Sequence, residues 1–188
     1  DVPCEFIVTV EHGSVGETIL TTAETENCDL IVCPYEPEDG DPSTYVRRIL
    51  NGNTDAIVFR SSTDRTNWQR ILVMVRSSGG LANAMLDFAQ RLLPSEGTVS
   101  TCTCVSKQQE RRTAEIMLEN LVESLGARTE TRVANGSIET FLGRNASLYD
   151  LVIVGASTDR SAVSRFVSTP TYERIHDVDC DLAIVHRA

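Results

Sequence analysis

The stretch DLVIVGASTDRSAVSRF, residues 150–166, holds the side chains best suited to chemistry in this chain. An apolar strand pattern leads into Gly155, and small hydroxyl residues follow at Ser157, Thr158 and Ser161. A strand, a glycine turn and a helix-like segment in this order are typical of a loop that binds phosphate through backbone N–H groups. Such loops usually hold several glycines, and here Gly155 stands alone. The hydroxyls can donate to an anion, but they do not replace a nest of amides.

A second candidate anion site follows the apolar run RILVMV, residues 70–75. Arg76 comes next, and an SGG triplet beginning at Ser78 leads into a helix pattern. One interpretation is a flexible turn in which Ser78 is the N-cap of the helix. The other is an anion site in which Arg76 and the helix start face Arg160 across the sheet, because ligands bind at the carboxyl ends of parallel strands.

Other catalytic signals are weak. The cysteines form no CxxC pair, and most lie in apolar strand-like runs, which predicts core thiols rather than a zinc site. Two of them alternate along one strand and share a face, but two thiols do not complete a tetrahedral site. The histidines are scattered and form no Ser-His-Asp or Cys-His arrangement, so we expect no catalytic residue, no metal site and no enzyme activity. These residues are Cys4, Cys28, Cys33, Cys102, Cys104, Cys180, His12, His176 and His186.

The composition narrows the class of protein. The chain has 188 residues, 41% of them hydrophobic, which fits one domain of ordinary size or one and a half small ones. Its formal net charge is -10, and only Lys107 among its 17 basic residues is a lysine. Such a charge disfavours nucleic acid as a partner and, with arginine favoured over lysine, predicts a halophilic protein. No apolar run is long enough to cross a bilayer, and the start at Asp1 without a methionine indicates a piece of a longer chain.

An internal repeat organises the elements that must position these residues. The first copy contains VEHGSV (10–15), DLIV (29–32) and DAIVFR (55–60), and the second contains VANGSI (133–138), DLVIV (150–154) and DLAIVHR (181–187). Each copy reads as a strand, a helix that starts at Gly-Ser, a strand that starts with Asp, a second helix and a last strand that ends in Arg. Ser14 and Ser137 are the expected N-caps.

Only the second copy has the elements that precede this pattern. A strand at 70–75, a helix with apolar residues at helical spacing from Leu81 to Leu92, a strand over 98–105 and a helix over 107–125 come before it. Alternating strands and helices predict an α/β fold with a parallel sheet. We therefore predict a partial domain over 1–62, a linker over 63–67 and a complete domain over 68–188. The first copy exposes a sheet edge, so we expect the two last strands to pair within the chain and a homodimer to cover the deficient unit.

The second unit resembles a universal stress protein domain of the UspA-like family. The resemblance implies a flavodoxin-like fold, also described as adenine nucleotide alpha hydrolase-like, with strand order 3-2-1-4-5. It also implies a regulatory or stress-response role in the cytoplasm, and one subgroup of the family binds ATP. The motifs that carry it are RILVMV (70–75), VANGSIETFL (133–142), YDLVIVGAS (149–157) and CDLAIVHR (180–187).

The ATP-binding members resemble one another in the loop after the fourth strand, and this chain departs from their pattern. Counting from Gly155, the second and third glycines are replaced by Thr158 and Ser168, while the hydroxyl residue that follows is kept as Thr169. After the first strand those members carry an acidic residue, and Arg76 stands at that position here. A β-branched residue at positive φ costs about 1–3 kcal/mol, so the same backbone cradle is disfavoured.

Three hypotheses follow. The leading one is a non-catalytic regulatory module that is degenerate in nucleotide binding and has no cofactor. Related families attach such domains to membrane transporters, so the resemblance also implies that this module is the cytosolic C-terminal domain of a transporter, such as an amino-acid permease or an antiporter. The second is an ATP or AMP sensor that uses the loop from Gly155 to Thr169. The third is an ATP-dependent enzyme of the related pyrophosphate-loop type that uses the SGG triplet. The candidate binding residues are Arg76, Ser78, Gly155, Ser157, Thr158, Ser168 and Thr169.

Overall fold

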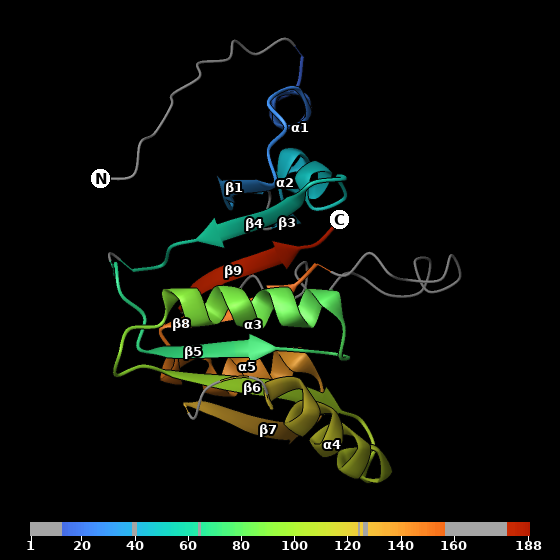
Figure 1. The fold of residues 1–188 in the computed structure, drawn as a ribbon, viewed down its shortest axis with the longest axis vertical. Coiled ribbons are helices and arrows are strands. Elements are labelled where there is room, and N and C mark those ends of the chain that lie inside the picture. Colours follow the sequence, from blue (N-terminus) through green and yellow to red (C-terminus); the bar gives the residue numbers. More distant parts are fainter. Residues whose placement is uncertain (1–12, 39–40, 64, 124, 126–127, 157–179) are drawn as a thin grey trace.

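A computed structural model of the chain describes residues 13–38, 41–63, 65–123, 125, 128–156 and 180–188. One mostly parallel sheet runs through the molecule, with helices on both faces (Figure 1). This is the α/β class that the alternation of strands and helices predicts.

The five described strands of the C-terminal part run parallel to one another. Their spatial order is β7-β6-β5-β8-β9, which is the order 3-2-1-4-5 expected of a flavodoxin-like domain. β5, β8 and β9 are buried on both faces because helices cover both sides, which explains their continuous apolar runs. Their bounds are β5 Arg70–Met74, β6 Thr98–Val105, β7 Thr129–Asn135, β8 Leu151–Gly155 and β9 Asp181–His186.

The N-terminal part extends the same sheet. β4 (Asp55–Arg60) pairs antiparallel with β9, and β1 (Leu30–Pro34) pairs parallel with β4. The prediction that the two last strands pair within the chain is therefore confirmed, with Ala56 opposite His186 and Arg60 opposite Leu182. A separate small sheet joins β2 (Pro37–Glu38) to β3 (Asp41–Pro42).

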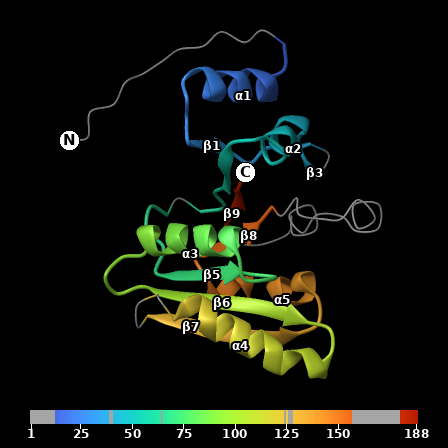
Figure 2. The same ribbon diagram turned by 45° about the vertical axis from the view of Figure 1, so that its right-hand side comes forward.

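The helices divide between the two faces of the sheet (Figures 1 and 2). α3 (Gly80–Leu92) and α4 (Arg111–Val122) cover one face, and α5 (Ile138–Asn145) covers the other. α1 (Val15–Thr25) and α2 (Thr44–Ile49) pack on the α5 side of the N-terminal strands. Two short 3-10 turns, Gln108–Glu110 and Ala146–Leu148, complete the described elements. Among the described residues, no helix combines the length and apolarity that crossing a membrane requires.

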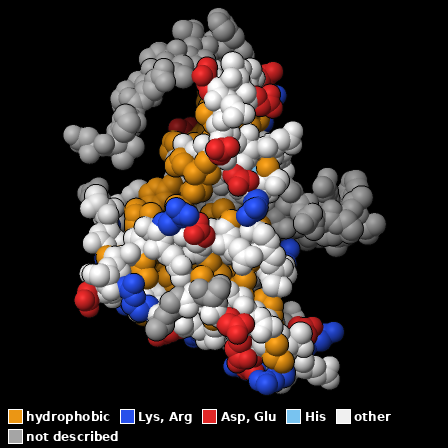
Figure 3. All heavy atoms as spheres, viewed as in Figure 1, with side chains coloured by type: hydrophobic (Ala, Val, Ile, Leu, Met, Phe, Trp, Pro, Cys, Tyr) orange, Lys and Arg blue, Asp and Glu red, His pale blue; other side chains and the backbone are white. Residues whose placement is uncertain are grey.

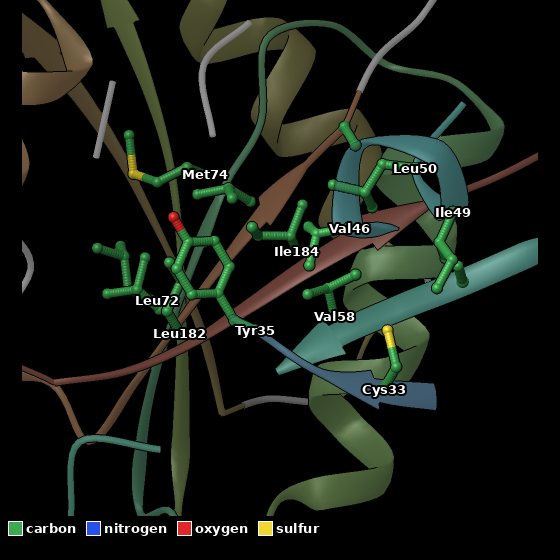
Figure 4. Close-up of a cluster of buried hydrophobic side chains, with 14 of the residues drawn as sticks. Cys33, Tyr35, Val46, Ile49, Leu50, Val58, Leu72, Met74, Leu182 and Ile184 are labelled. Carbon is green, nitrogen blue, oxygen red and sulfur yellow. The ribbon is translucent and has the colours of Figure 1, made fainter. Parts of the chain in front are cut away.

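One apolar core on the α5 side runs unbroken across the junction between β4 and β9. It contains Val46 and Ile49 from α2, Val58 from β4 and Ile184 from β9, all fully buried. Figure 4 shows these side chains pointing toward one another, together with Tyr35, Leu72 and Met74. The N-terminal and C-terminal parts therefore share a core.

The two Gly-Ser pairs start helices as predicted. Ser14 accepts a hydrogen bond from the Glu17 N–H at the start of α1, and Ser137 accepts one from the Thr140 N–H at the start of α5. The glycine before each cap has a positive φ, 114° at Gly13 and 107° at Gly136. Because a positive φ favours glycine, both residues of the Gly-Ser pair are explained by the turn.

Two buried aspartates fasten the linker between β4 and β5 to the sheet. We call this group the linker clamp: Asp150 and Asp181 with the donors of residues 62–70. The Asp181 carboxylate, fully buried, accepts from the Ser62 N–H at 2.8 Å, the Thr63 N–H at 3.1 Å and Trp68 Nε1 at 2.7 Å. Trp68 also meets Phe59 edge to face, with ring centroids 5.7 Å apart. Trp68 therefore joins the linker to both β9 and β4.

Asp150 makes the remaining contacts of the linker clamp. Its carboxylate accepts from the Gln69 and Arg70 N–H groups, each at 2.9 Å, and pairs with the Arg65 guanidinium. Burial by itself raises the pKa of Asp150, but these backbone hydrogen bonds and the positive charge of Arg65 outweigh burial and hold the pKa below its ordinary value.

We expect Asp150 to make the protein acid-sensitive. A carboxyl whose pKa is lower in the folded state stabilises the fold at pH values above its unfolded pKa, and this contribution is lost as the pH falls through the folded pKa. The Asp150→Asn variant should therefore unfold more easily than the natural chain at neutral pH, and the gap should close in acid. Thermal unfolding across a pH series measures this gap. A gap that stays constant with pH would contradict the account.

Candidate functional site

The candidate site lies where β5 and β8 end side by side. Their carboxyl ends meet at one edge of the sheet, and the chain leaves β5 toward β6 but β8 toward β9, on opposite sides. Such a point of reversal is where open α/β sheets bind ligands. Arg76 and the SGG triplet follow β5, and Gly155 ends β8, so the fold brings these predicted residues to the same edge.

Gly155 is required by packing rather than by backbone conformation. It is not among the described residues with positive φ. A Cβ added at Gly155 would lie 2.8 Å from Leu81 Cδ2 and 3.4 Å from Met85 Sδ, both on α3. The glycine therefore lets α3 approach β8 closely, which is one of the roles of glycine at a strand–helix crossing. The interpretation of Gly155 as the first amide of a phosphate cradle gains no support from its conformation.

The Gly155→Ala variant should lower the free energy of unfolding by about 1–2 kcal/mol, since the added methyl overlaps the end of the Leu81 side chain. Leu81 is only partly buried and can give way, which keeps the cost at the lower end. Combining Gly155→Ala with Leu81→Ala should cost less than the sum of the two single changes. Denaturant unfolding followed by Trp68 fluorescence measures all three variants; strict additivity would contradict the packing role.

The structure corrects the predicted start of α3. The N-cap is Gly79, with φ 154° and no side-chain cap, so the prediction that Ser78 caps the helix is wrong. The physical reason is that Gly79 takes a backbone conformation suited to glycine, which places the turn one residue later than Ser78. Ser78, Gly79 and Gly80 are all exposed, and the first N–H groups of a helix have no acceptor within the helix.

Arg187 reaches the same helix start and was not predicted as a site residue. It follows β9, and its Nη1 donates to the Gly80 carbonyl oxygen at 3.4 Å. Its guanidinium also lies 3.5–3.7 Å from the position of a Cβ added at Gly80. The repeat pattern, in which the last strand ends in Arg, is the signal that could have found it. Arg76 and Arg187 are both exposed at this edge, which gives it positive charge in an acidic chain.

Ser157, Thr158, Ser168 and Thr169 lie outside the described residues, as does Arg160. The described part of the site can do one kind of chemistry, which is to attract an anion through the α3 N-terminus and the two arginines. The position directly after β5 holds Arg76, so no carboxylate stands there to accept from a ribose.

His186 and most of the described cysteines belong to the core or its margin. His186 in β9 is buried, and its Nε2 lies 2.9 Å from the Gly52 carbonyl oxygen, as expected for a structural strand residue. Burial raises the pKa of the Cys33 thiol, and likewise of the Cys180 thiol, to about 11. These thiols are core residues, whereas Cys28 is exposed. Among the described residues, no group of three or more His, Cys, Asp or Glu is arranged to hold a metal ion.

Comparison with known proteins gives structural matches only. No described family and no curated protein matches the sequence. A universal stress protein from Archaeoglobus fulgidus DSM 4304 superposes with a TM-score of 0.68 at 12% identity, over 92% of this chain and 67% of that one. A functionally unknown protein from Pseudomonas aeruginosa PAO1 gives 0.60 at 16% identity, over 92% and 68% of the two chains.

A third match comes from a transport protein. The cytoplasmic domain of a prokaryotic cation chloride cotransporter superposes with a TM-score of 0.59 at 12% identity, over 91% of this chain and 70% of that one. At these identities the matches establish the fold alone. The chain has the α/β fold of universal stress proteins, with a sheet that continues through β9 into β4 and β1.

Proposed function

We propose that the chain is a non-catalytic regulatory module of the universal stress type, with a partial unit over 1–62 and a complete unit over 68–188. The observation that carries this proposal is the β5–β8 edge, where the strand order of universal stress proteins is present. At this edge α3 packs against Gly155, and Arg76 and Arg187 are exposed, but no carboxylate stands directly after β5 to accept a hydrogen bond from a nucleoside. The matching Gly-Ser helix starts at Ser14 and Ser137 support the partial unit as a copy of the complete one.

The module is degenerate in ATP binding. Gly155 serves helix packing, and the sequence replaces the later glycines with Thr158 and Ser168. Charged phosphates would still meet Arg76 and the α3 N-terminus, so a weak anion preference survives without a site for the nucleoside. The alternatives are an ATP or AMP sensor that uses Gly155 to Thr169, and an ATP-dependent enzyme that uses the SGG triplet. The exposed, uncapped turn at Gly79 does not favour either over the leading proposal.

The transporter match supports a proposal for the cellular setting. The chain covers 70% of a cotransporter's cytoplasmic domain at a TM-score of 0.59, which supports a role as the cytosolic domain of a membrane transporter. The acidic, arginine-favouring composition supports a halophilic source. Since the last strands of both units already pair within the chain, a homodimer would have to use another surface.

Calorimetric titration of the chain with ATP and with AMP, in molar salt with and without Mg²⁺, tests the proposal. We expect no saturable heat at ligand concentrations up to the millimolar range and no release of phosphate. Magnesium-dependent binding without turnover would replace the proposal with the sensor, and turnover would replace it with the enzyme. Sequence upstream of Asp1 that encodes apolar helical spans would support the transporter setting.

A further inference from the structure

In the part of the chain that the structure describes, the face of β1 on the α3 side of the sheet is apolar and left uncovered; we call it the bare face. The side chains of Leu30 and Val32 are 47% and 66% exposed, although both lie in a strand of the main sheet. Figure 3 shows hydrophobic side chains gathered over β1 and β4, above α3. A hollow of about 480 Å³ opens there, with Val32, Pro34 and Phe59 in its lining. Large exposed apolar patches on soluble domains mark binding surfaces.

β1 is also an open edge. Within the described residues it pairs with β4 on one side only. Tyr35 N–H donates to the Phe59 carbonyl oxygen on β4, and successive residues of a strand point their backbone groups to opposite sides. The backbone of Val32 therefore faces the open side, where an edge strand invites another strand.

The corresponding surface of the C-terminal part is fully covered. Leu151 and Ile153 hold the positions in the DLVIV motif that Leu30 and Val32 hold in DLIV, and both are fully buried. β5 supplies the cover at the edge, with Ile71 opposite Leu151 and Val73 opposite Ile153. α3 supplies the cover on the face, since Leu81 and Met85 lie against the end of β8.

The pairing of β4 with β9 relates the two halves. The parallel pair β1–β4 meets the parallel pair β8–β9 through one antiparallel ladder, and such a ladder has a local two-fold axis perpendicular to the sheet. This axis maps each face of the sheet onto itself. In agreement, α1 lies on the same face as α5. The axis therefore places the open side of β1 where β5 pairs with β8, and it places the bare face where α3 covers β8.

We propose that this surface binds a strand–helix unit of the β5–α3 type, with an apolar strand parallel to β1 and an amphipathic helix over Leu30 and Val32. The inference rests on the proposed organisation as a partial and a complete unit. A second copy of the chain cannot supply the unit, because its β5 is already paired on both sides. Pro34 replaces Gly155 at the corresponding position, so the bound helix carries a small residue where α3 has Leu81.

The test supplies the unit within one polypeptide. A fusion places a duplicate of residues 68–127 ahead of Asp1 of the full chain, and hydrogen–deuterium exchange of residues 29–34 is followed by mass spectrometry. We expect exchange at Leu30 and Val32 to slow by at least about tenfold relative to the chain alone, since strand pairing protects amides. In the matched control fusion, Ile71→Asp and Val73→Asp in the duplicate only, exchange should return to that of the chain alone.

Several results would overturn the inference. Unchanged exchange in the fusion would do so, as would two separate unfolding transitions, which would show that the duplicate does not join the sheet. Slow exchange in the chain alone, with sedimentation showing a dimer that Val32→Asp converts to monomer, would assign the surface to a second copy. Nucleotide binding in the calorimetric titration would contradict the proposed function, but the exchange results would still test this inference independently.

Discussion

The Asp181→Ala variant is expected to lose about 3 kcal/mol of unfolding free energy, because the change removes a buried carboxylate that accepts several hydrogen bonds at once. The carboxylate accepts from two backbone N–H groups, at Ser62 and Thr63, and from the indole of Trp68. Hydrogen bonds to a charged acceptor are stronger than neutral ones, and a donor left buried without a partner pays its desolvation cost. Urea unfolding followed by far-UV circular dichroism measures the loss without relying on Trp68.

An exposed aspartate at the start of β1 serves as a control. Asp29 holds the same Asp-Leu position as Asp150 but is exposed, so Asp29→Ala should change stability by no more than about 0.5 kcal/mol. The Asp181→Asn variant keeps one acceptor oxygen and should fall between the natural chain and Asp181→Ala. Equal effects of Asp29→Ala and Asp181→Ala would show that the linker clamp does not hold the two parts of the chain together.

The second large effect is a difference in stability between two residues, Ile153 and Val32, that hold the same position in the repeated motif. Ile153→Ala should cost about 2–5 kcal/mol, because the side chain is fully buried between β5 and α3 and its removal leaves a cavity. Val32→Ala should cost no more than about 0.5 kcal/mol in the chain alone, because Val32 is 66% exposed. Thermal or denaturant unfolding of both variants measures the difference.

The Val32→Ala variant also tests whether the bare face of β1 is covered in solution. A cost of 2 kcal/mol or more for Val32→Ala in the chain alone would mean that something already covers β1 under the conditions of the measurement, and a large-to-small change in a core has about that cost. Repeating the experiment at low and high protein concentration then tells whether the cover is another copy, because only association makes stability depend on concentration.

Local patterns were enough to predict most of the fold. The strand over 98–105 was predicted with its observed bounds, because alternating Thr and Cys on a parallel strand leaves a clear period of two. The Gly-Ser helix starts were predicted because a positive-φ glycine followed by a capping serine is a local signal. The strand order followed from the resemblance to universal stress proteins, and the β4–β9 pairing followed from the repeat, since equivalent apolar edges satisfy each other.

What the sequence could not supply depends on long-range geometry. The role of Gly155 follows from the position of Leu81 on a helix that is distant in sequence. Asp150 and Asp181 read only as markers of strand starts, whereas the structure shows them binding a linker more than eighty residues earlier in the chain. The prediction that Ser78 is the N-cap of α3 was wrong because both Ser78 and Gly79 can precede a helix, and only the backbone conformation decides between them.

The site itself could be predicted only in part. Arg76 and Gly155 were brought to one edge as expected, because carboxyl ends of adjacent parallel strands must meet there. Arg187 was missed, since its contact with the Gly80 carbonyl depends on how far β9 extends beyond β8. The hydroxyls from Ser157 to Thr169 remain predictions from the sequence.

The central claim is that the β5–β8 edge keeps the family fold but no longer holds ATP, and equilibrium binding of labelled ATP tests it most directly. The natural chain is compared with the triple variant Arg76→Asp, Thr158→Gly, Ser168→Gly, which restores the acid and the two glycines of the pattern. We predict no saturable binding by the natural chain up to millimolar ATP, and measurable binding by the triple variant. Micromolar, magnesium-dependent binding by the natural chain would contradict the claim.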